Sequence, residues 1–315
     1  MTLPAYAPRR AARSLFVPLR GLHYHVNAWG EAALATPERP PLVLLHGWMD
    51  VGTSFQFVVD ALAEAEGFER WVLAPDWRGF GRTTWPAVDS YWFADYLGDL
   101  DALLGALAPA VAVDLVGHSM GGNVAMSYAG LRPQRLRRLV NLEGFGLPPT
   151  TPSQAPRRLV KWLDALAQPQ TMRDYASAAE VAARLTKTNP RLGADKAQWL
   201  ALQWAQPGAD GRWRVRGDPV HKRPSAVPYR VDETLEIWKR IAAPLLWVEG
   251  DASDPSDRWG ERYSKAEFHA RLAVVPQVQR HRLADCGHML HHDRPQELAA
   301  LLAAFLAAGP MPTSP

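Results

Sequence analysis

The chain has 315 residues, of which 47% are hydrophobic and 21% charged, with a formal net charge of +3. This length and balance predict a large folded domain with a substantial core and room for an inserted subdomain, and they exclude an intrinsically disordered chain. No basic stripe interleaved with aromatic residues is present, so we do not expect nucleic-acid binding.

Cysteine usage and the termini indicate the compartment. The single cysteine, Cys286, excludes an intrachain disulfide and is compatible with a reducing compartment. The basic stretch 1–13 is not followed by an apolar run, so we expect no signal peptide. No stretch approaches about 18 apolar residues, so we expect no membrane span. These features predict a cytoplasmic protein and leave its oligomeric state open.

The first elements predict an antiparallel strand pair at the edge of a sheet. Residues 15–19 and 22–28 have strand-like composition and are joined at Arg20-Gly21. His23 and His25 lie on one face of the second strand. Because no third ligand is near in sequence, we interpret them as a surface pair and not as a metal site.

The next predicted strand ends in a turn that we expect to form one side of a pocket. Residues 40–45 form a continuous apolar run, typical of a strand buried on both faces of a parallel sheet. It ends in His46-Gly47, where glycine permits a sharp turn that leaves the backbone N–H of Trp48 free to bind an oxyanion. We expect His46, Gly47 and Met49 to line the substrate pocket.

A helix, a strand and a glycine-rich loop follow. We expect the helix over 54–66, and the strand over 71–74 leads into a loop that runs from Asp76 to Arg82. In that loop we expect Asp76 and Arg78 to form a stiffening ion pair. Apolar residues over 93–107 then recur at steps of three and four, which predicts an amphipathic helix.

The strongest motif follows the strand 113–118 and reads Gly117-His118-Ser119-Met120-Gly121. In a Gly-x-Ser-x-Gly turn from strand to helix, the positions two before and two after the serine must lack side chains. The turn would expose the Ser119 hydroxyl at the carboxyl edge of the sheet and aim the Met120 N–H at an oxyanion, with His118 at the pocket. The alternative is the same turn in a non-catalytic protein of the same fold.

Strand and helix alternate through residues 1–146, which predicts a parallel sheet with helices on both faces. A helix follows Ser119, and a short strand over 139–142 ends at Glu143. Phe145, just beyond, is expected to line the pocket.

The segment 147–230 is rich in proline, tryptophan and short helical stretches. We interpret it as a helical cap inserted over the carboxyl edge of the sheet, with Trp162 as a pocket wall, although cap tryptophans also serve simply to pack a cap onto a core. The core resumes over 231–315. Its expected elements are helices at 233–241, 265–272 and 297–306 and strands at 245–249 and near 281–284.

Together, His-Gly-Trp at 46–48, Gly-His-Ser-Met-Gly-Gly at 117–122 and Gly-His-Met-Leu at 287–290 resemble the α/β-hydrolase superfamily. The run at 262–265 looks like the serine hydrolase-like esterases with a cap. The resemblance implies a mostly parallel, doubly wound α/β-hydrolase sheet with an inserted helical cap. It also implies that His288 is the general base for Ser119.

The catalytic acid departs from the common pattern of this family. Most relatives carry an Asp at the position that is Ser253 here. One alternative is Asp254, or less readily Asp251, after a one-residue shift in the loop. The other is Glu143, which resembles haloalkane dehalogenases with a catalytic Glu at this place. The sequence leaves Glu143 and Asp254 open.

A serine nucleophile indicates acyl transfer, because its alkyl ether would resist the water that opens the alkyl ester of an Asp. We expect a serine-dependent carboxylesterase for small to medium apolar acyl or aryl esters, with no cofactor. A lactonase, thioesterase or C–C bond hydrolase would use the same residues, and a non-catalytic ligand-binding protein is the alternative of another class. Although His291 and His292 follow His288 at steps of three and four, a complete serine apparatus accounts for this region and we expect no metal site.

Overall fold

The computed structural model describes residues 6–65, 68–109 and 111–308. Two expectations fall partly outside these ranges. The expectation of no signal peptide used residues 1–5, and the helix expected over 54–66 was to end at Glu66. None of the helices in these ranges combines the length and apolarity needed to cross a membrane.

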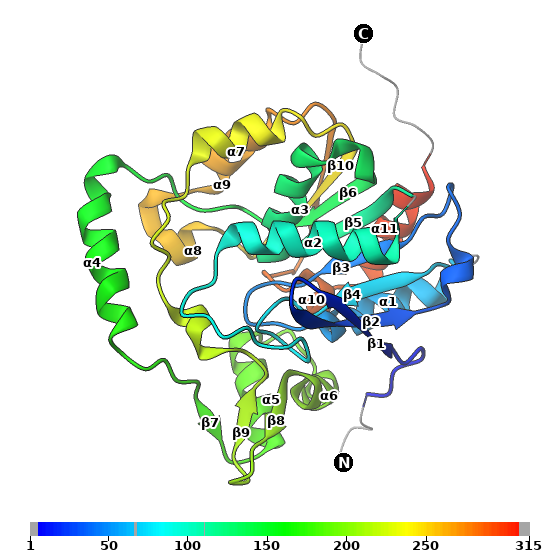
Figure 1. The fold of residues 1–315 in the computed structure, drawn as a ribbon. Coiled ribbons are helices and arrows are strands. Elements are labelled where there is room, and N and C mark those ends of the chain that lie inside the picture. The colour runs from blue at the N-terminus through cyan, green and yellow to red at the C-terminus, as the bar shows by residue number, and fades with distance from the viewer. Residues whose placement is uncertain (1–5, 66–67, 110, 309–315) are drawn as a thin grey trace.

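An eight-stranded sheet forms the centre of the molecule, in the order β1-β2-β4-β3-β5-β6-β10-β11 (Figure 1). Only the pairs β1–β2 and β2–β4 are antiparallel. The predicted mostly parallel sheet and its antiparallel edge hairpin are confirmed. The strands are β1 Arg13–Leu19, β2 Leu22–Trp29, β3 Leu42–Leu45, β4 Val72–Pro75, β5 Val113–His118, β6 Leu136–Leu142, β10 Leu245–Gly250 and β11 Val278–Leu283.

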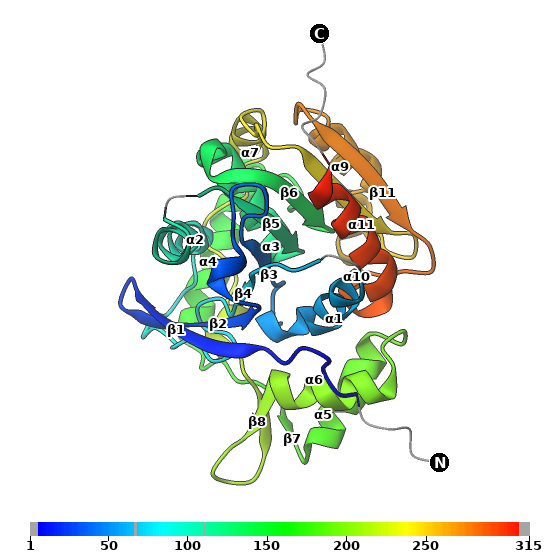
Figure 2. The same ribbon diagram turned by 90° about the vertical axis from the view of Figure 1, so that its right-hand side faces the viewer.

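Helices cover both faces of this sheet, which makes the fold doubly wound (Figure 2). α1 and α11 pack together on one face, and α2, α3, α7 and α9 cover the other. The flanking helices are α1 Gln56–Glu64, α2 Phe93–Leu107, α3 Met120–Leu131, α7 Val231–Trp238, α9 Lys265–Leu272 and α11 Pro295–Ala307, and two short helices, α8 Ser256–Trp259 and α10 Leu290–Asp293, lie in loops.

The continuous apolar run of β3 follows from these two layers. Leu42 and Leu44 belong to the core beneath α1 and α11, whereas Val43 and Leu45 belong to the core beneath α2 and α3. Because successive side chains of a strand point to opposite faces, a strand covered on both faces is apolar at every position.

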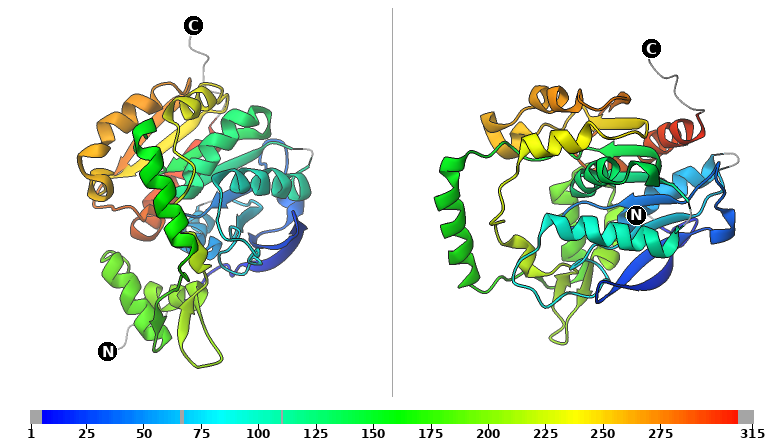
Figure 3. Two further views of the ribbon diagram at one scale, coloured as in Figure 1. Left: turned by 60° about the vertical axis from the view of Figure 1, so that its left-hand side comes forward. Right: turned by 45° about the horizontal axis from the view of Figure 1, so that its top comes forward.

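The segment predicted as a helical cap contains helices and also a small sheet. Its helices are α4 Ala155–Leu166, α5 Ala178–Thr188 and α6 Ala194–Trp204. The strands β7 Asp174–Tyr175, β9 Trp213–Val215 and β8 Ala205–Pro207 form an antiparallel sheet that the sequence did not predict. Strands of two or three residues are too short to show alternating hydrophobicity. Figure 3 shows α4 standing apart from the helices that cover the main sheet.

Two expected side-chain arrangements are wrong. His25 is buried, not on the surface, and its Nδ1 lies 2.8 Å from Asp76 Oδ2. Arg78 does not pair with Asp76 but binds both oxygens of Asp99 on α2, at 2.6 Å each. Asp99 is fully buried and requires a counter-charge, which the sequence alone does not reveal because the two elements are distant along the chain.

Candidate active site

Ser119 stands at the turn between β5 and α3 in a conformation that non-glycine residues rarely adopt, with φ 52° and ψ −116°. The backbone passes itself so closely here that a Cβ on Gly117 would lie 2.3 Å from Gly121 O, and one on Gly121 would lie 2.2 Å from Leu45 O. The sequence argument for the two glycines thus has its geometric counterpart. Strained backbone of this kind gathers at functional sites.

The turn from Gly117 to Gly121, which we call the elbow, leads to a prediction about stability. We expect Gly117→Ala to lower the free energy of unfolding by about 3 kcal/mol, because the new methyl group would meet backbone that cannot move aside. Gly105→Ala on α2 is the matched control. Nothing lies within 4 Å of its added Cβ, so we expect it to stabilise by about 0.5–1 kcal/mol. Urea unfolding followed by circular dichroism measures both, and an equal effect of the two substitutions would contradict this account.

Three side chains from distant parts of the chain form a hydrogen-bonded series. His288, in the loop between β11 and α10, places Nε2 3.0 Å from Ser119 Oγ and Nδ1 2.8 Å from Glu143 Oε2. Glu143 follows β6, and its side chain is fully buried. The imidazole therefore contacts a hydroxyl on one side and a carboxylate on the other, which is the geometry of a nucleophile, its base and an orienting acid.

Glu143 is held by two further donors. The N–H of Gly250 lies 2.8 Å from its Oε1, and the Ser253 hydroxyl donates to its Oε2 at 2.5 Å. Ser253, at the position where the family pattern predicts the acid, thus donates to the carboxylate that contacts His288. The backbone of Glu143 is also unusual, with φ 56°.

The alternative carboxylates have other partners. Asp254 Oδ1 accepts the N–H of Ser256 at 2.8 Å, at the start of α8, and Asp251 Oδ1 accepts the N–H of Cys286 at 3.0 Å. Of the two acids that the sequence leaves open, the structure brings Glu143 and not Asp254 to His288.

Two backbone N–H groups adjoin the serine. The N–H of Met120 opens α3, where the helix dipole favours negative charge, and the N–H of Trp48 lies in the turn after β3. That turn packs against the elbow, since a Cβ on Gly47 would lie 3.2 Å from Ser119 Cβ. Within the described ranges, neither N–H donates a hydrogen bond to a backbone carbonyl outside the regular helices and strands.

Three residues expected to line the pocket are buried instead. His46 donates from Nδ1 to Gly47 O, and its Nε2 accepts the Trp77 N–H. His118 lies 2.8 Å through Nε2 from the carbonyl oxygen of His288, and Phe145 packs edge-on against Trp247. All three are at least 95% buried, so they present little surface to a substrate in this structure.

Trp48, expected as an oxyanion donor, and two of the expected pocket residues, Met49 and Trp162, are more exposed. The Trp48 side chain is 51% exposed beside the elbow, and Met49, half-buried, accepts a hydrogen bond from Trp204 of α6 through its carbonyl oxygen. Trp162 lies on α4, where its Nε1 donates to Ser90 Oγ, and it has no hydrogen bond or ring contact to the residues around Ser119 that the structure describes.

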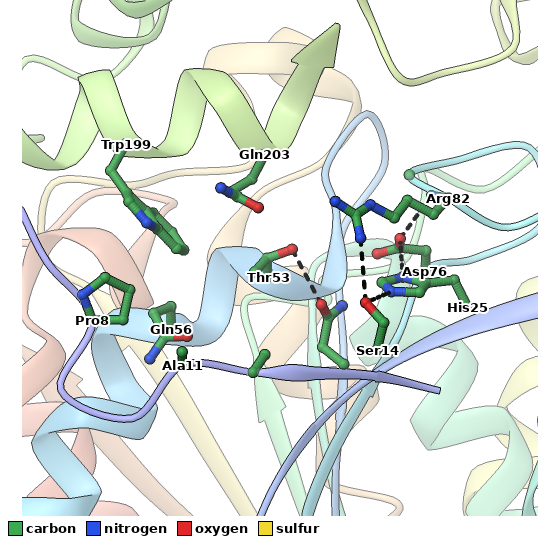
Figure 4. A pocket seen from close by; sticks show the side chains of 13 residues that line it. Pro8, Ala11, Ser14, His25, Thr53, Gln56, Asp76, Arg82, Trp199 and Gln203 are labelled. Atoms are coloured by element: carbon green, nitrogen blue, oxygen red, sulfur yellow. Dashed lines mark hydrogen bonds and ion pairs between the residues drawn. The ribbon is translucent and has the colours of Figure 1, made fainter. Parts of the chain in front are cut away.

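A cavity of about 220 Å³ lies elsewhere, between β1, β2, the start of α1 and α6 (Figure 4). Its lining includes His25, Arg82 and Trp199 but none of the residues in contact with His288. Three of its polar side chains contact one another. Ser14 Oγ lies 2.9 Å from His25 Nε2 and 3.2 Å from an Arg82 nitrogen.

A buried histidine outside the site predicts acid sensitivity. His221 is stacked between Phe80 and Tyr91, with ring centroids 3.8 and 3.6 Å away, and burial lowers its pKa from 6.5 to about 3. The His221 imidazole is protonated more readily in the unfolded chain than in the folded one. Its contribution to the free energy of unfolding is therefore full above pH 6.5 and is lost progressively as the pH falls toward 3. We expect the loss to approach about 1.4 kcal/mol per pH unit. Urea unfolding of wild type and His221→Asn between pH 7.5 and 4.5 measures it, and equal slopes would contradict it.

Sequence reasoning missed part of a second cluster near the site. One possible ligand atom from each of Asp50, His291 and His292 lies within 4.8 Å of the others, and all three side chains are buried. The two histidines were noticed, but Asp50 precedes them by more than two hundred residues and no local motif connects it to them.

Comparison with known proteins places this geometry in a family. The family described as the alpha/beta hydrolase fold matches residues 40–295. A serine hydrolase-like protein of Danio rerio is 24% identical over 95% of this chain and 89% of its own. A 3-hydroxybutyrate-oligomer hydrolase of Cupriavidus necator is 31% identical over 91% and 94%. The solved thioesterase domain from the curacin biosynthetic pathway has a TM-score of 0.79 and 28% identity, over 93% of this chain and 99% of that domain. The chain therefore belongs to the α/β-hydrolase fold family.

Proposed function

We propose that the protein is a serine hydrolase that cleaves carboxylic esters of small to medium apolar acyl or aryl groups. The observation that carries this proposal is the unbroken series from Ser119 Oγ through His288 to Glu143, at 3.0 and 2.8 Å. The named relatives include a 3-hydroxybutyrate-oligomer hydrolase and a thioesterase domain, which supports hydrolysis as the reaction class.

In the proposed reaction, His288 Nε2 takes the Ser119 proton while Oγ attacks the ester carbonyl. The N–H groups of Trp48 and Met120 stabilise the oxyanion, and Glu143 stabilises the imidazolium. Collapse transfers the proton from Nε2 to the leaving alcohol and forms an acyl ester on Ser119. A water deprotonated by His288 then attacks this ester and restores the free hydroxyl.

Glu143 suits the role of orienting acid. Its two oxygens accept from Gly250 and Ser253, so it can hold His288 in one orientation through the cycle. With Oε2 accepting the Nδ1–H, the imidazole keeps Nε2 free to take the serine proton.

The preference for apolar esters is supported by the apolar side chain of Trp48, which is 51% exposed in the turn that packs against Ser119. Leu147, which begins the segment 147–230, is another exposed apolar side chain, at 45%. We propose that this segment acts as a cap, as expected from the sequence, and that these side chains contact the acyl or alkyl group. Removing apolar surface from water supplies binding free energy at about 25 cal/mol per Å².

A labelling experiment tests the nucleophile. We expect a fluorophosphonate probe to label the wild type and fail on Ser119→Ala, while Ser153→Ala, which removes an exposed hydroxyl, labels normally. A panel of p-nitrophenyl esters and lactones of graded acyl length then defines the substrate. A folded wild type that neither takes the probe nor turns over any ester would overturn the proposal in favour of a non-catalytic binding protein.

A thioesterase is the second candidate, favoured by the similarity to the curacin thioesterase domain. The same serine apparatus attacks a thioester carbonyl. Comparing kcat/KM for an oxoester and a pantetheine thioester of one acyl group separates the two candidates. A thioester advantage beyond the intrinsic difference in their uncatalysed hydrolysis would favour the thioesterase.

A further inference from the structure

A polar cluster behind the active site joins two segments that are distant in sequence. Asp50 lies in the turn after β3, Ser54 in the following 3-10 turn Gly52–Phe55, and His291 and His292 in α10. The Ser54 hydroxyl is its centre, at 2.8 Å from Asp50 Oδ2, 3.0 Å from His291 Nε2 and 2.7 Å from His292 Nε2. His291 Nε2 and Asp50 Oδ2 are 3.6 Å apart.

We propose that Asp50, His291 and His292 form a binding site for a divalent transition metal ion of the Zn²⁺ or Co²⁺ type. Two imidazoles and one carboxylate are ligands that these ions prefer. Bonds of about 2.0–2.1 Å in tetrahedral geometry place ligand atoms about 3.3 Å apart, close to the 3.6 Å that separates His291 Nε2 from Asp50 Oδ2. The other separations, within 4.8 Å, require small movements of side chains. The Ser54 oxygen or a water completes four ligands.

Burial and charge favour this occupant. The four side chains are nearly inaccessible, with only 7% and 5% exposure at Asp50 and His292. Burial lowers the pKa of His292 to about 3, so its imidazole is neutral and able to coordinate at neutral pH. Although burial alone would raise the pKa of Asp50, the adjacent His291 and His292 lower it to about 2. The site therefore offers the Asp50 carboxylate and a neutral His292 imidazole, with His291 beside them.

Without a metal, the same atoms form a hydrogen-bonded cluster around Ser54. The hydroxyl has one proton and two lone pairs, so it donates to Asp50 and accepts from two imidazole N–H groups. A metal would exchange this arrangement for coordination by both nitrogens, after each imidazole moves its proton to Nδ1. Binding thus needs no unfolding, only a change of tautomer and a short contraction of the ligands.

The site is coupled to the proposed base. His291 is three residues after His288, and its ring centroid lies 4.5 Å from that of His118. His118 in turn lies within hydrogen-bond distance of the carbonyl oxygen of His288. Drawing α10 toward Asp50 would displace the loop that carries His288. We therefore expect the metal to inhibit ester hydrolysis, and this consequence alone rests on the proposed function.

Calorimetric titration of chelator-treated protein with Zn²⁺ tests the site. We expect one ion per chain, with at least about 100-fold weaker binding in His292→Asn, since even outer-shell changes cost 10–100-fold. His281→Asn, which removes an exposed imidazole on β11, is the matched control and should bind normally. Retained tight binding in His292→Asn would overturn the proposal, because the ion would then be held elsewhere, for example by His288 and Glu143.

A spectroscopic arm remains informative if His292→Asn fails to fold. Co²⁺ added to the wild type should produce the intense visible d–d bands of a tetrahedral ion, and Ser54→Cys should add a thiolate charge-transfer band and tighten Zn²⁺ binding about tenfold or more. A hydroxyl with only a hydrogen-bonding role would not give this gain. Absence of tetrahedral bands in both proteins would overturn the site whether or not the protein hydrolyses esters, so failure here is distinguishable from failure of the proposed hydrolase.

Discussion

Replacing Glu143 by glutamine should lower kcat for ester hydrolysis by about 10³–10⁴, whereas Asp254→Asn should change it by less than about threefold. The amide keeps the shape of the side chain but cannot stabilise the imidazolium, and to donate its N–H to Nδ1 it would hold His288 in the wrong tautomer. Asp254 contacts the N–H of Ser256 instead, so its loss affects only the start of α8.

The two substitutions are matched, since each exchanges one carboxylate for an amide in a loop at the same edge of the sheet. Initial rates on the best p-nitrophenyl ester, with circular dichroism to verify folding, measure both effects. Fluorophosphonate labelling should slow in Glu143→Gln, because the same base activates Ser119. If Asp254→Asn were the damaging change, the loop after β10 would have to rearrange in solution and the acid assignment would be wrong.

The fold could be predicted from the sequence because its signals are local and periodic. The helix expected at 93–107 has those bounds in the structure, since its apolar residues recur over four turns and pack beneath one layer. The strand at 40–45 was recognisable because both of its faces are covered. The small sheet of β7, β8 and β9 was missed because its strands carry no periodic signal.

Sequence reasoning proposed one nucleophile and one base but left the acid between two candidates. The glycine spacing around Ser119 has a steric cause, whereas His288 was proposed from the resemblance to the family. Choosing between Glu143 and Asp254 requires knowing that β6 and β10 are neighbours, with Leu142 opposite Val248, so that Glu143 comes beside Gly250 and Ser253. That register follows from packing across the sheet, as does the meeting of Asp50 with His291.

Moving the acid from position 143 to position 253 is the second prediction with a large effect. Glu143→Ala should cost about 10³–10⁴ in kcat, and adding Ser253→Asp should restore at least about tenfold. Ser253 Oγ lies 2.5 Å from the carboxylate oxygen that contacts His288, so an Asp at 253 extends its oxygens into the space that Glu143→Ala vacates. The acid would then occupy the position used by most relatives.

Ser253→Asp alone is the informative control. With Glu143 present, two carboxylates would lie within hydrogen-bond distance, and their repulsion would keep one protonated near neutral pH. We expect the free energy of unfolding of this single variant to be lower than that of the wild type at pH 8 and to recover as the pH falls toward 5. The double variant has only one carboxylate here, so its stability should not show this dependence on pH. If the double variant stayed as inactive as Glu143→Ala while remaining folded, an acid near Nδ1 would be insufficient, and the backbone of the β6 loop, strained at residue 143, would be needed to aim it.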